Sequence, residues 1–161
     1  MEVIEIDDFM TQEECDHYIE GIESKENVRK FTTTGIFKND RYKDSILANH
    51  LFSKLNVDLD IRPHSLIITG KYVPGQRFGL HTDAGDYYDH ETGERSKYTM
   101  IVYLNEPVGG ELQFYDNVGN KMHLIAPKMG KCVIFDIDLF HEALPVLERN
   151  KYWIGMELIG K

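Results

Sequence analysis

The sequence predicts a mostly β domain in which N-terminal helices support an antiparallel β-sandwich or jelly roll. Two amphipathic helical segments lie in the first third of the chain, and about eight short segments rich in β-branched and aromatic residues follow with no helix between them. Strands joined by turns argue against a βαβ arrangement. At 161 residues the chain suits one core. We expect a single domain over residues 1–161, with supporting elements in 1–60 and the jelly-roll core in 61–161.

The N-terminal part combines a strand with two helices. Residues 3–6 predict a strand, and Thr11 and Glu14 form a capping box that opens a helix with one apolar stripe. Residues 23–43 are polar and predict a mobile connection or a lid. Leucines recur at a spacing of four over residues 45–55, which predicts a second amphipathic helix.

The rest of the chain predicts short strands bounded by Gly, Pro, Asn or Asp clusters. Residues 99–104 are apolar on both alternating faces, so this strand is expected in the centre of a sheet. The expected strands cover residues 65–72, 78–81, 98–104, 111–115, 121–125, 131–135, 142–146 and 152–159.

The composition restricts the partners that we expect. The chain has 27 acidic and 18 basic residues and a formal charge of −9, so it lacks the basic surplus of proteins that bind nucleic acid or anionic lipid. No apolar run approaches the roughly 20 residues of a membrane helix, and the acidic start is unlike a secretory signal. The two cysteines, Cys15 and Cys132, do not form a disulfide framework. We expect a cytoplasmic protein.

Three side chains form a candidate metal site. His81 and Asp83 are two positions apart at the end of an expected strand, so their side chains can point to the same side. His141 begins another expected strand, which a jelly roll can bring next to the first. Two histidines and one carboxylate leave three adjacent positions of an octahedron open, as in non-haem iron(II) oxygenases. Catalytic zinc accepts the same donors, and that alternative stays open.

A cation is expected beside this site. Iron(II) together with Asp83 leaves one net positive charge, so a bound dicarboxylate needs one further cation for neutrality. Lys151, ten positions after His141, begins the last expected strand. A buried ammonium is favourable when it meets a carboxylate. Arg149 has the same strand parity and is the competing candidate.

The remaining candidates are interpreted as structural. Residues 83–89 form an acidic run that is typical of a solvated loop, and Trp153 is interpreted as core packing. The other histidines have no comparable partners and are assigned no role: His17, His50, His64, His90 and His123.

The motifs follow one another in an ordered series along nearly the whole chain. After segments at 4–9 and 13–15, Tyr-Val-Pro-Gly-Gln at 72–76 leads into His81 and Asp83. Further motifs lie at 103–105, 109–112, 114, 127–130 and 135, and 141–146 precedes Lys151. In this order and spacing the chain resembles the prolyl 4-hydroxylase-like branch of the iron(II)/2-oxoglutarate-dependent dioxygenases.

The resemblance implies a double-stranded β-helix (jelly-roll) core of about eight strands with two helices packed on its major sheet. It implies that His81, Asp83 and His141 bind iron(II). It also favours Lys151 over Arg149 as the residue that binds the remote carboxylate of 2-oxoglutarate. The other cosubstrate contacts that it implies are Tyr72, through its hydroxyl, and the pocket-lining residues Ile101, Tyr103 and Leu112.

The activity implied by the resemblance is hydroxylation of an unactivated C–H bond, with 2-oxoglutarate and dioxygen as cosubstrates and succinate and carbon dioxide as products. Ascorbate is a further candidate cofactor. Prolyl residues in a peptide or protein are the first expected substrate, and a free amino acid or other small molecule is the alternative. A non-catalytic, cupin-like metal-binding module is a further alternative. Residues 23–43 and 84–97 match the family poorly, which leaves the substrate open.

Overall fold

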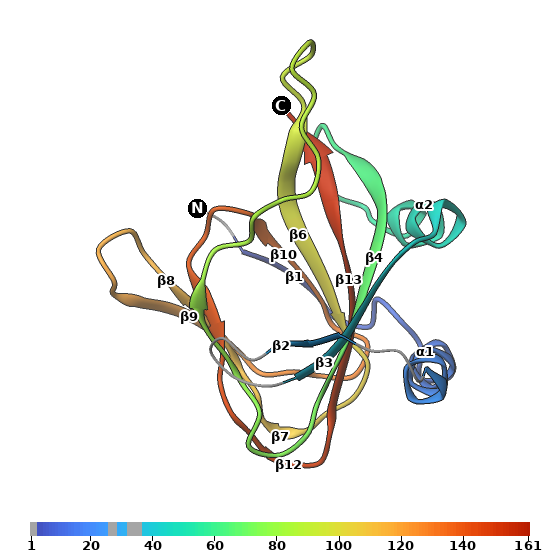
Figure 1. The fold of residues 1–161 in the computed structure, drawn as a ribbon, viewed down its shortest axis with the longest axis vertical. Helices are drawn as coiled ribbons and strands as arrows, with labels where there is room; N and C mark the ends of the chain where they lie inside the picture. The colour runs from blue at the N-terminus through green and yellow to red at the C-terminus, as the bar shows by residue number, and fades with distance from the viewer. Residues whose placement is uncertain (1–2, 26–28, 32–36) are drawn as a thin grey trace.

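Two facing β-sheets form the body of the molecule, and two helices cover the outer side of the larger sheet (Figure 1). The computed structural model describes residues 3–25, 29–31 and 37–161. The larger sheet has seven strands, in the spatial order β1 (Ile4–Ile6), β10 (Cys132–Asp136), β6 (Arg95–Tyr103), β13 (Lys151–Gly160), β4 (Arg62–Tyr72), β3 (Phe37–Lys43) and β2 (Arg29–Phe31).

The smaller sheet faces the larger one across the interior. Its four strands lie in the order β5 (Phe78–His81), β11 (His141–Ala143), β8 (Leu112–Tyr115) and β9 (Lys121–Ile125). A separate pair, β7 (Val108–Gly109) and β12 (Val146–Glu148), closes the lower end in Figure 1. All strand pairs are antiparallel, so the predicted mostly β jelly roll with N-terminal helices is confirmed.

The helices bury the outer face of the larger sheet. Helix α1 (Gln12–Ser24) begins with the predicted capping box, in which Thr11 and Glu14 each bond the other's backbone N–H. Helix α2 (Ser45–Ser53) begins at an Asp44 cap and packs on β4. Their apolar stripes meet the sheet in one core cluster that includes Cys15, Ile22, Ala48, Leu51, Ile67, Met100, Ile154 and Met156. Among the described helices, neither has the length and apolar character needed to cross a bilayer.

The prediction of a connection or lid over residues 23–43 was wrong for much of its length. Helix α1 continues to Ser24, and residues 29–31 and 37–43 are strands β2 and β3 of the larger sheet. Strand β3 pairs with β4 through its backbone, while its own residues are nearly all polar. The strand therefore lacks the apolar alternation that identifies strands in sequence. Residues 26–28 and 32–36 lie outside the described part.

Two smaller differences concern the strands near the C-terminus. The single strand expected over residues 142–146 is divided into β11 and β12, because Pro145 has no backbone N–H to continue the ladder. Each part then pairs with a different partner strand, β8 for one and β7 for the other. Strand β7 was not predicted, since two residues carry no periodic signal. The expected central position of residues 99–104 is confirmed, as β6 lies between β10 and β13.

The register of the larger sheet determines which side chains face the smaller sheet. Directly opposed residues of antiparallel strands share a face. Tyr72 is opposite Lys151, and in the next row on the same face Gly70 is opposite Trp153. Trp153 is in turn opposite Tyr103 on β6. These rows form the wall of the interior that lies across from β5 and β11.

Candidate metal centre and adjoining cavity

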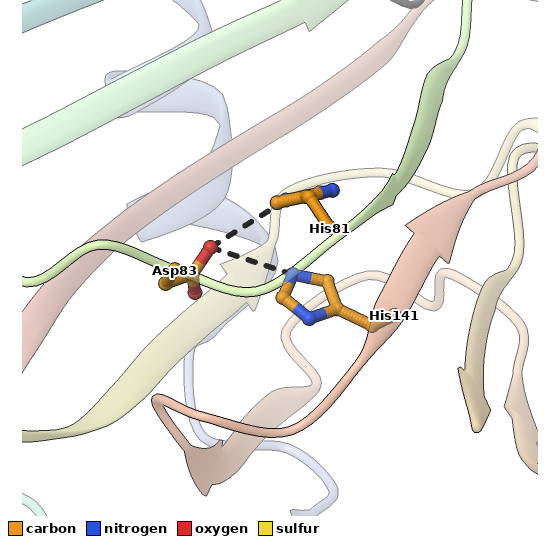
Figure 2. Close-up of side chains that lie close together, drawn as sticks. All are labelled: His81, Asp83 and His141. Atoms are coloured by element: carbon orange, nitrogen blue, oxygen red, sulfur yellow. Dashed lines mark ion pairs between the residues drawn. The ribbon is translucent and has the colours of Figure 1, made fainter. Parts of the chain in front are cut away.

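Two histidines and one aspartate meet where the smaller sheet faces the interior (Figure 2). His81 is the last residue of β5 and His141 the first of β11, and the two are directly opposed in the strand register. Asp83 follows β5, and its Oδ1 lies 3.5 Å from Nε2 of each histidine. The three ligand atoms all lie within 4.8 Å of one another. Such separations are long for hydrogen bonds but suit donors around one ion.

The backbone orients both imidazole rings. Nδ1 of His81 lies 2.6 Å from the carbonyl oxygen of Gly79, and Nδ1 of His141 lies 2.8 Å from that of Leu139. A carbonyl oxygen can only accept a hydrogen bond, so each Nδ1 carries the proton and donates. In the neutral ring Nε2 then keeps its lone pair, and this pair points toward Asp83. Metal-binding histidines in proteins are commonly held in this way by a partner on the other ring nitrogen.

The Asp83 carboxylate is fixed from both sides. Burial raises the pKa of Asp83, but the neighbouring His141 and His81 side chains and the hydrogen bond from Thr99 outweigh burial and hold the pKa well below its usual value. Thr99 Oγ1 donates to Oδ2 at 2.5 Å, which leaves Oδ1 directed at the two imidazoles. The carboxylate is therefore ionised and presents one oxygen to the centre of the group.

A cavity of about 390 Å³ adjoins the three side chains and is mainly apolar, as ligand sites in proteins usually are. All of the residues predicted from the sequence to bind or line the cosubstrate site, except the competing Arg149, border it: Tyr72, His81, Asp83, Ile101, Tyr103, Leu112, His141 and Lys151.

Lys151 places a cation on the wall of this cavity. The residue is only 2% exposed, and its ammonium donates to the carbonyl oxygen of Gly110 at 2.8 Å. Nζ also lies 4.7 Å from the ring centre of Tyr72 and 5.5 Å from that of Tyr103. Among the described residues, no acidic side chain forms an ion pair with it. Burial lowers the pKa of Lys151 to about 7, although the Glu111 charge acts in the opposite direction.

Glycine is required where the backbone meets this ammonium. Gly110 has a φ of +71°, which L side chains rarely adopt, and a Cβ there would lie 3.0 Å from Cδ of Lys151. Arg149, the competing cation, is placed differently. It is exposed, its Nε donates to the carbonyl oxygen of Glu106, and it does not border the cavity.

Several cavity residues were missed in the sequence. Trp153, interpreted as packing, borders the cavity, as do the polar residues Asn39, Arg41, Thr99 and Glu157. Arg41 and Asn39 lie on the strand that was taken for a connection, so nothing linked them to a site. Thr99 lies in β6, whose first residues Arg95, Ser96 and Lys97 are also polar, so its polarity gave no signal. Glu157 lies between Met156 and Leu158 and is the one acidic residue of β13, which was the available signal for that residue.

Comparison with known proteins identifies the family. The model of the 2OG-Fe(II) oxygenase superfamily matches residues 68–156, which is more than half of the chain. The chain belongs to this superfamily, whose chemistry uses iron(II), 2-oxoglutarate and dioxygen. The matched segment contains His81, Asp83, His141 and Lys151. Among curated protein sequences, none matches the chain.

Solved structures with the same fold include several prolyl hydroxylases. A Pseudomonas putida prolyl-4-hydroxylase has a TM-score of 0.76 at 18% identity, over 99% of this chain and 92% of that one. The viral collagen prolyl hydroxylase of Paramecium Bursaria Chlorella virus-1 has a TM-score of 0.69 at 21% identity, over 99% and 96%. A Trichoplax adhaerens prolyl hydroxylase, in complex with a hypoxia inducible factor peptide fragment, has a TM-score of 0.73 at 16% identity, over 97% of this chain and 82% of that one. The likeness confirms the double-stranded β-helix fold.

The burial of Lys151 leads to a prediction about stability. We expect Lys151→Met to raise the free energy of unfolding of the ligand-free protein at pH 7 by roughly 1–3 kcal/mol, because a buried ammonium without a carboxylate is replaced by an apolar chain of similar length. Urea unfolding followed by circular dichroism measures the difference.

The pH dependence gives the control. The folded pKa of about 7 is below the ordinary value of 10.5, so the unfolded chain binds this proton more tightly. The wild type should therefore gain stability relative to Lys151→Met as the pH rises from 7 toward 10. A difference that stays constant over this interval would mean that the lysine titrates normally.

Proposed function

We propose that this protein is an iron(II)- and 2-oxoglutarate-dependent hydroxylase in which His81, Asp83 and His141 hold the iron. The observation that carries the proposal is that these donors and the buried Lys151 ammonium border one cavity. A metal with three protein donors on one side has room for a chelating cosubstrate on the other. Membership of the superfamily supports iron as the metal.

Lys151 is the feature that favours iron chemistry over a hydrolytic zinc site. A buried ammonium without an acidic partner is unfavourable in the ligand-free protein. A dicarboxylate that meets it gains a charge-assisted hydrogen bond and removes this cost. A zinc hydrolase, in which the metal activates water, needs no such cation. The same residue argues against a module that only binds metal, because it equips the cavity for a second, anionic ligand.

Iron(II), when bound, would supply the coordination positions and the redox chemistry by which a C–H substrate, dioxygen and 2-oxoglutarate are converted to the hydroxylated substrate, succinate and carbon dioxide. The protein holds the donors in place and controls the surroundings. The backbone carbonyls of Gly79 and Leu139 keep the imidazole lone pairs directed inward, and Thr99 holds Oδ2 of Asp83. Because hydrogen bonds to the backbone and to Thr99 already orient the three side chains, the donors are in place before any ligand binds.

The cosubstrate is held by Lys151 in this proposal. Within the described part of the chain its ammonium donates one hydrogen bond, to Gly110, and Lys151 borders the cavity, so its other N–H groups can meet the remote carboxylate. Tyr72 and Tyr103 pack against the same ammonium, and burial raises the pKa of each hydroxyl, which keeps both protonated. Ile101 and Leu112 exclude water from the intervening space.

The proposed substrate is a prolyl residue in a peptide or protein. The printed descriptions of similar structures support this choice, since they name prolyl hydroxylases, one of them with a bound peptide. A free amino acid is the second candidate. The observation in its favour is the mixed charge on the cavity lining, where Arg41 lies on one strand and Asp86 and Glu157 lie elsewhere on the rim.

Cosubstrate binding can be tested without a known substrate. We expect the wild type to develop a visible charge-transfer absorption when iron(II) and 2-oxoglutarate are added without oxygen, because the cosubstrate chelates the metal. His81→Ala should lose this absorption. Lys151→Ala should weaken 2-oxoglutarate binding by at least tenfold, the scale of one charge-assisted hydrogen bond, and leave iron binding nearly unchanged.

Anaerobic spectroscopic titration measures both affinities. A band that persists in His81→Ala would make the metal assignment wrong. Equal losses of iron and 2-oxoglutarate in Lys151→Ala would instead point to damage of the fold, and Arg149→Ala is the matched control because that side chain lies outside the cavity.

Thr99 should matter for the metal through Asp83. We expect Thr99→Val, which keeps the shape and removes the hydroxyl, to weaken iron(II) binding about tenfold, because the carboxylate loses the donor that orients it. Thr99→Ser keeps the hydroxyl and should bind iron as the wild type does. Competition for iron(II) with a coloured chelator gives the dissociation constants. Equal constants for Thr99→Val and the wild type would mean that Thr99 does not support iron binding.

Product analysis tests the reaction itself. Under air, with iron(II) and 2-oxoglutarate, we expect succinate to form and a substrate to gain the mass of one oxygen atom. Mass spectrometry with proline-containing peptides and with free amino acids compares the two substrate candidates. If no succinate forms under any condition, the protein is not an oxygenase of this kind.

A further inference from the structure

Strand β3 contributes two polar side chains to the cavity, at a distance in sequence from the metal donors. Asn39 and Arg41 are two positions apart, so they lie on the same face of the strand. They are opposite Gly70 and Ile68 of β4, and both border the cavity. Neither takes part in the metal group or in the contacts of Lys151 described above. The proposed reaction gives neither residue a role in binding iron or 2-oxoglutarate.

Asn39 is buried without being satisfied. The residue is 6% exposed, and its Oδ1 has no hydrogen-bond partner within the described ranges. An unpaired buried amide oxygen costs free energy, on the order of 1–3 kcal/mol, so such atoms are rare in folded proteins. Because Asn39 borders the cavity, a ligand that brings an N–H group can supply the missing donor.

The wall beside Asn39 is built by Trp153. A Cβ on Gly70 would lie only 2.1 Å from Nε1 of Trp153, so the indole lies directly over the glycine. Gly70 is the β4 residue opposite both Asn39 on one side and Trp153 on the other. The absence of a side chain at Gly70 therefore allows a flat aromatic surface to extend along the sheet toward the amide. Such a surface, next to an unpaired acceptor, forms a subsite for a ligand with an apolar part and an N–H.

Charge on the cavity lining is divided between two sides. Arg41, on β3, is exposed and has no hydrogen-bond acceptor for its guanidinium within the part of the chain that the structure describes. Glu157 on β13 accepts from Ser96 Oγ at 2.5 Å and from the Asp86 N–H at 3.0 Å. His64, by its hydrogen bond, lowers the pKa of the Asp86 carboxyl, and the charges of Arg41 and Lys43 act in the same direction. The Asp86 carboxylate therefore lies close enough to Arg41 to interact with its charge, and Glu157 borders the same cavity.

We propose that Asn39 and Arg41 bind the main chain of an amino acid in the substrate, Asn39 Oδ1 accepting from its N–H and the Arg41 guanidinium donating to its carbonyl or carboxylate oxygen. The proposal rests on the hydroxylase function above and names the part of the substrate that the cavity recognises. Free proline carries its own N–H groups, whereas a prolyl residue within a peptide has none, so in a peptide the N–H comes from a residue next to the proline. With that assignment a peptide and a free amino acid share this chemistry. Asn39 and Arg41 are specificity-determining residues, and they lie apart from the metal donors.

The binding of two defined probes tests the proposal. The probes are free L-proline and a tripeptide with proline at its centre, acetylated and amidated at its ends. Isothermal titration without oxygen, in the presence of iron(II) and 2-oxoglutarate, gives the dissociation constants. We expect Asn39→Leu and Arg41→Gln each to weaken the probe that the wild type binds by about tenfold, the scale of one hydrogen bond to a charged or buried group.

The matched control is Asp40→Asn on the same strand. The Asp40 carboxylate pairs with Lys25 at 2.7 Å and points to the other face of β3, so this variant should bind the probes as the wild type does. Asn39→Asp keeps an acceptor oxygen and should recover most of the affinity lost in Asn39→Leu. A role of Asn39 in folding alone gives a different pattern, in which Leu and Asp variants lose thermal stability and probe binding together.

Stability separates the two explanations further. Asn39→Leu replaces an unsatisfied amide by an apolar side chain of similar size, so its melting temperature should equal or exceed that of the wild type while its probe affinity falls. Binding of the tripeptide only, or of L-proline only, supports the proposal and identifies the source of the main chain. If the wild type binds neither probe, or if Asn39→Leu binds as well as Asp40→Asn, the proposal is wrong.

A failure of this proposal can be distinguished from a failure of the hydroxylase assignment. The visible absorption of the iron(II) and 2-oxoglutarate complex is recorded in the same samples before any probe is added. If that absorption forms and the probe constants do not change in the variants, only the main-chain subsite is refuted. If the absorption never forms in the wild type, the assignment of the metal and cosubstrate site fails first.

Discussion

The burial of one ammonium group is the constraint around which the interior is arranged. Lys151 is the first residue of the central strand β13, so its position is set by the backbone ladder with β4 and not by a flexible loop. The carbonyl of Gly110 and two tyrosine rings surround it, and they lower the cost of burial without neutralising the charge. The proposed metal ligands lie across the interior, the two histidines at the ends of β5 and β11 in the opposite sheet and Asp83 just after β5. The two halves of the site thus depend on the separation of the two layers.

Much of this fold could be predicted from the sequence, because most elements have a periodic apolar face. The capping box at Thr11 and the leucines of α2 mark helices by local chemistry, and the strands from β4 onward carry β-branched and aromatic runs. Strand β3 could not be predicted in this way. Its stability comes from backbone pairing with β4, and its inward residues include Asn39 and Arg41, which are polar because the face they line is a cavity. Where a strand lines a cavity with polar residues, the apolar alternation that predicts a strand is lost.

The candidate site could also be predicted in part from the sequence. The spacing of two residues predicted that His81 and Asp83 lie together, and the order of motifs along the chain predicted His141 and Lys151 as their partners. All four residues border one cavity. What the sequence could not give was the long-range register. Nothing local relates Gly70 to Trp153, which meet through the pairing of β4 with β13. Nothing local relates Thr99 of β6 to Asp83 either, since Asp83 follows β5 of the other sheet. The cavity residues that were missed therefore come from strands whose alignment no local sequence pattern reports.

The arrangement in two layers has a mechanical consequence. Imidazole donors belong to the four-stranded layer and the ammonium to the seven-stranded one, and the cavity keeps the two apart at this point. A diacid that contacted both the imidazole side and the ammonium would connect the two sheets across the cavity. Binding of the diacid would then make the short strands β5 and β11 more rigid, and their amide protons would exchange more slowly with solvent while those of β13 changed little.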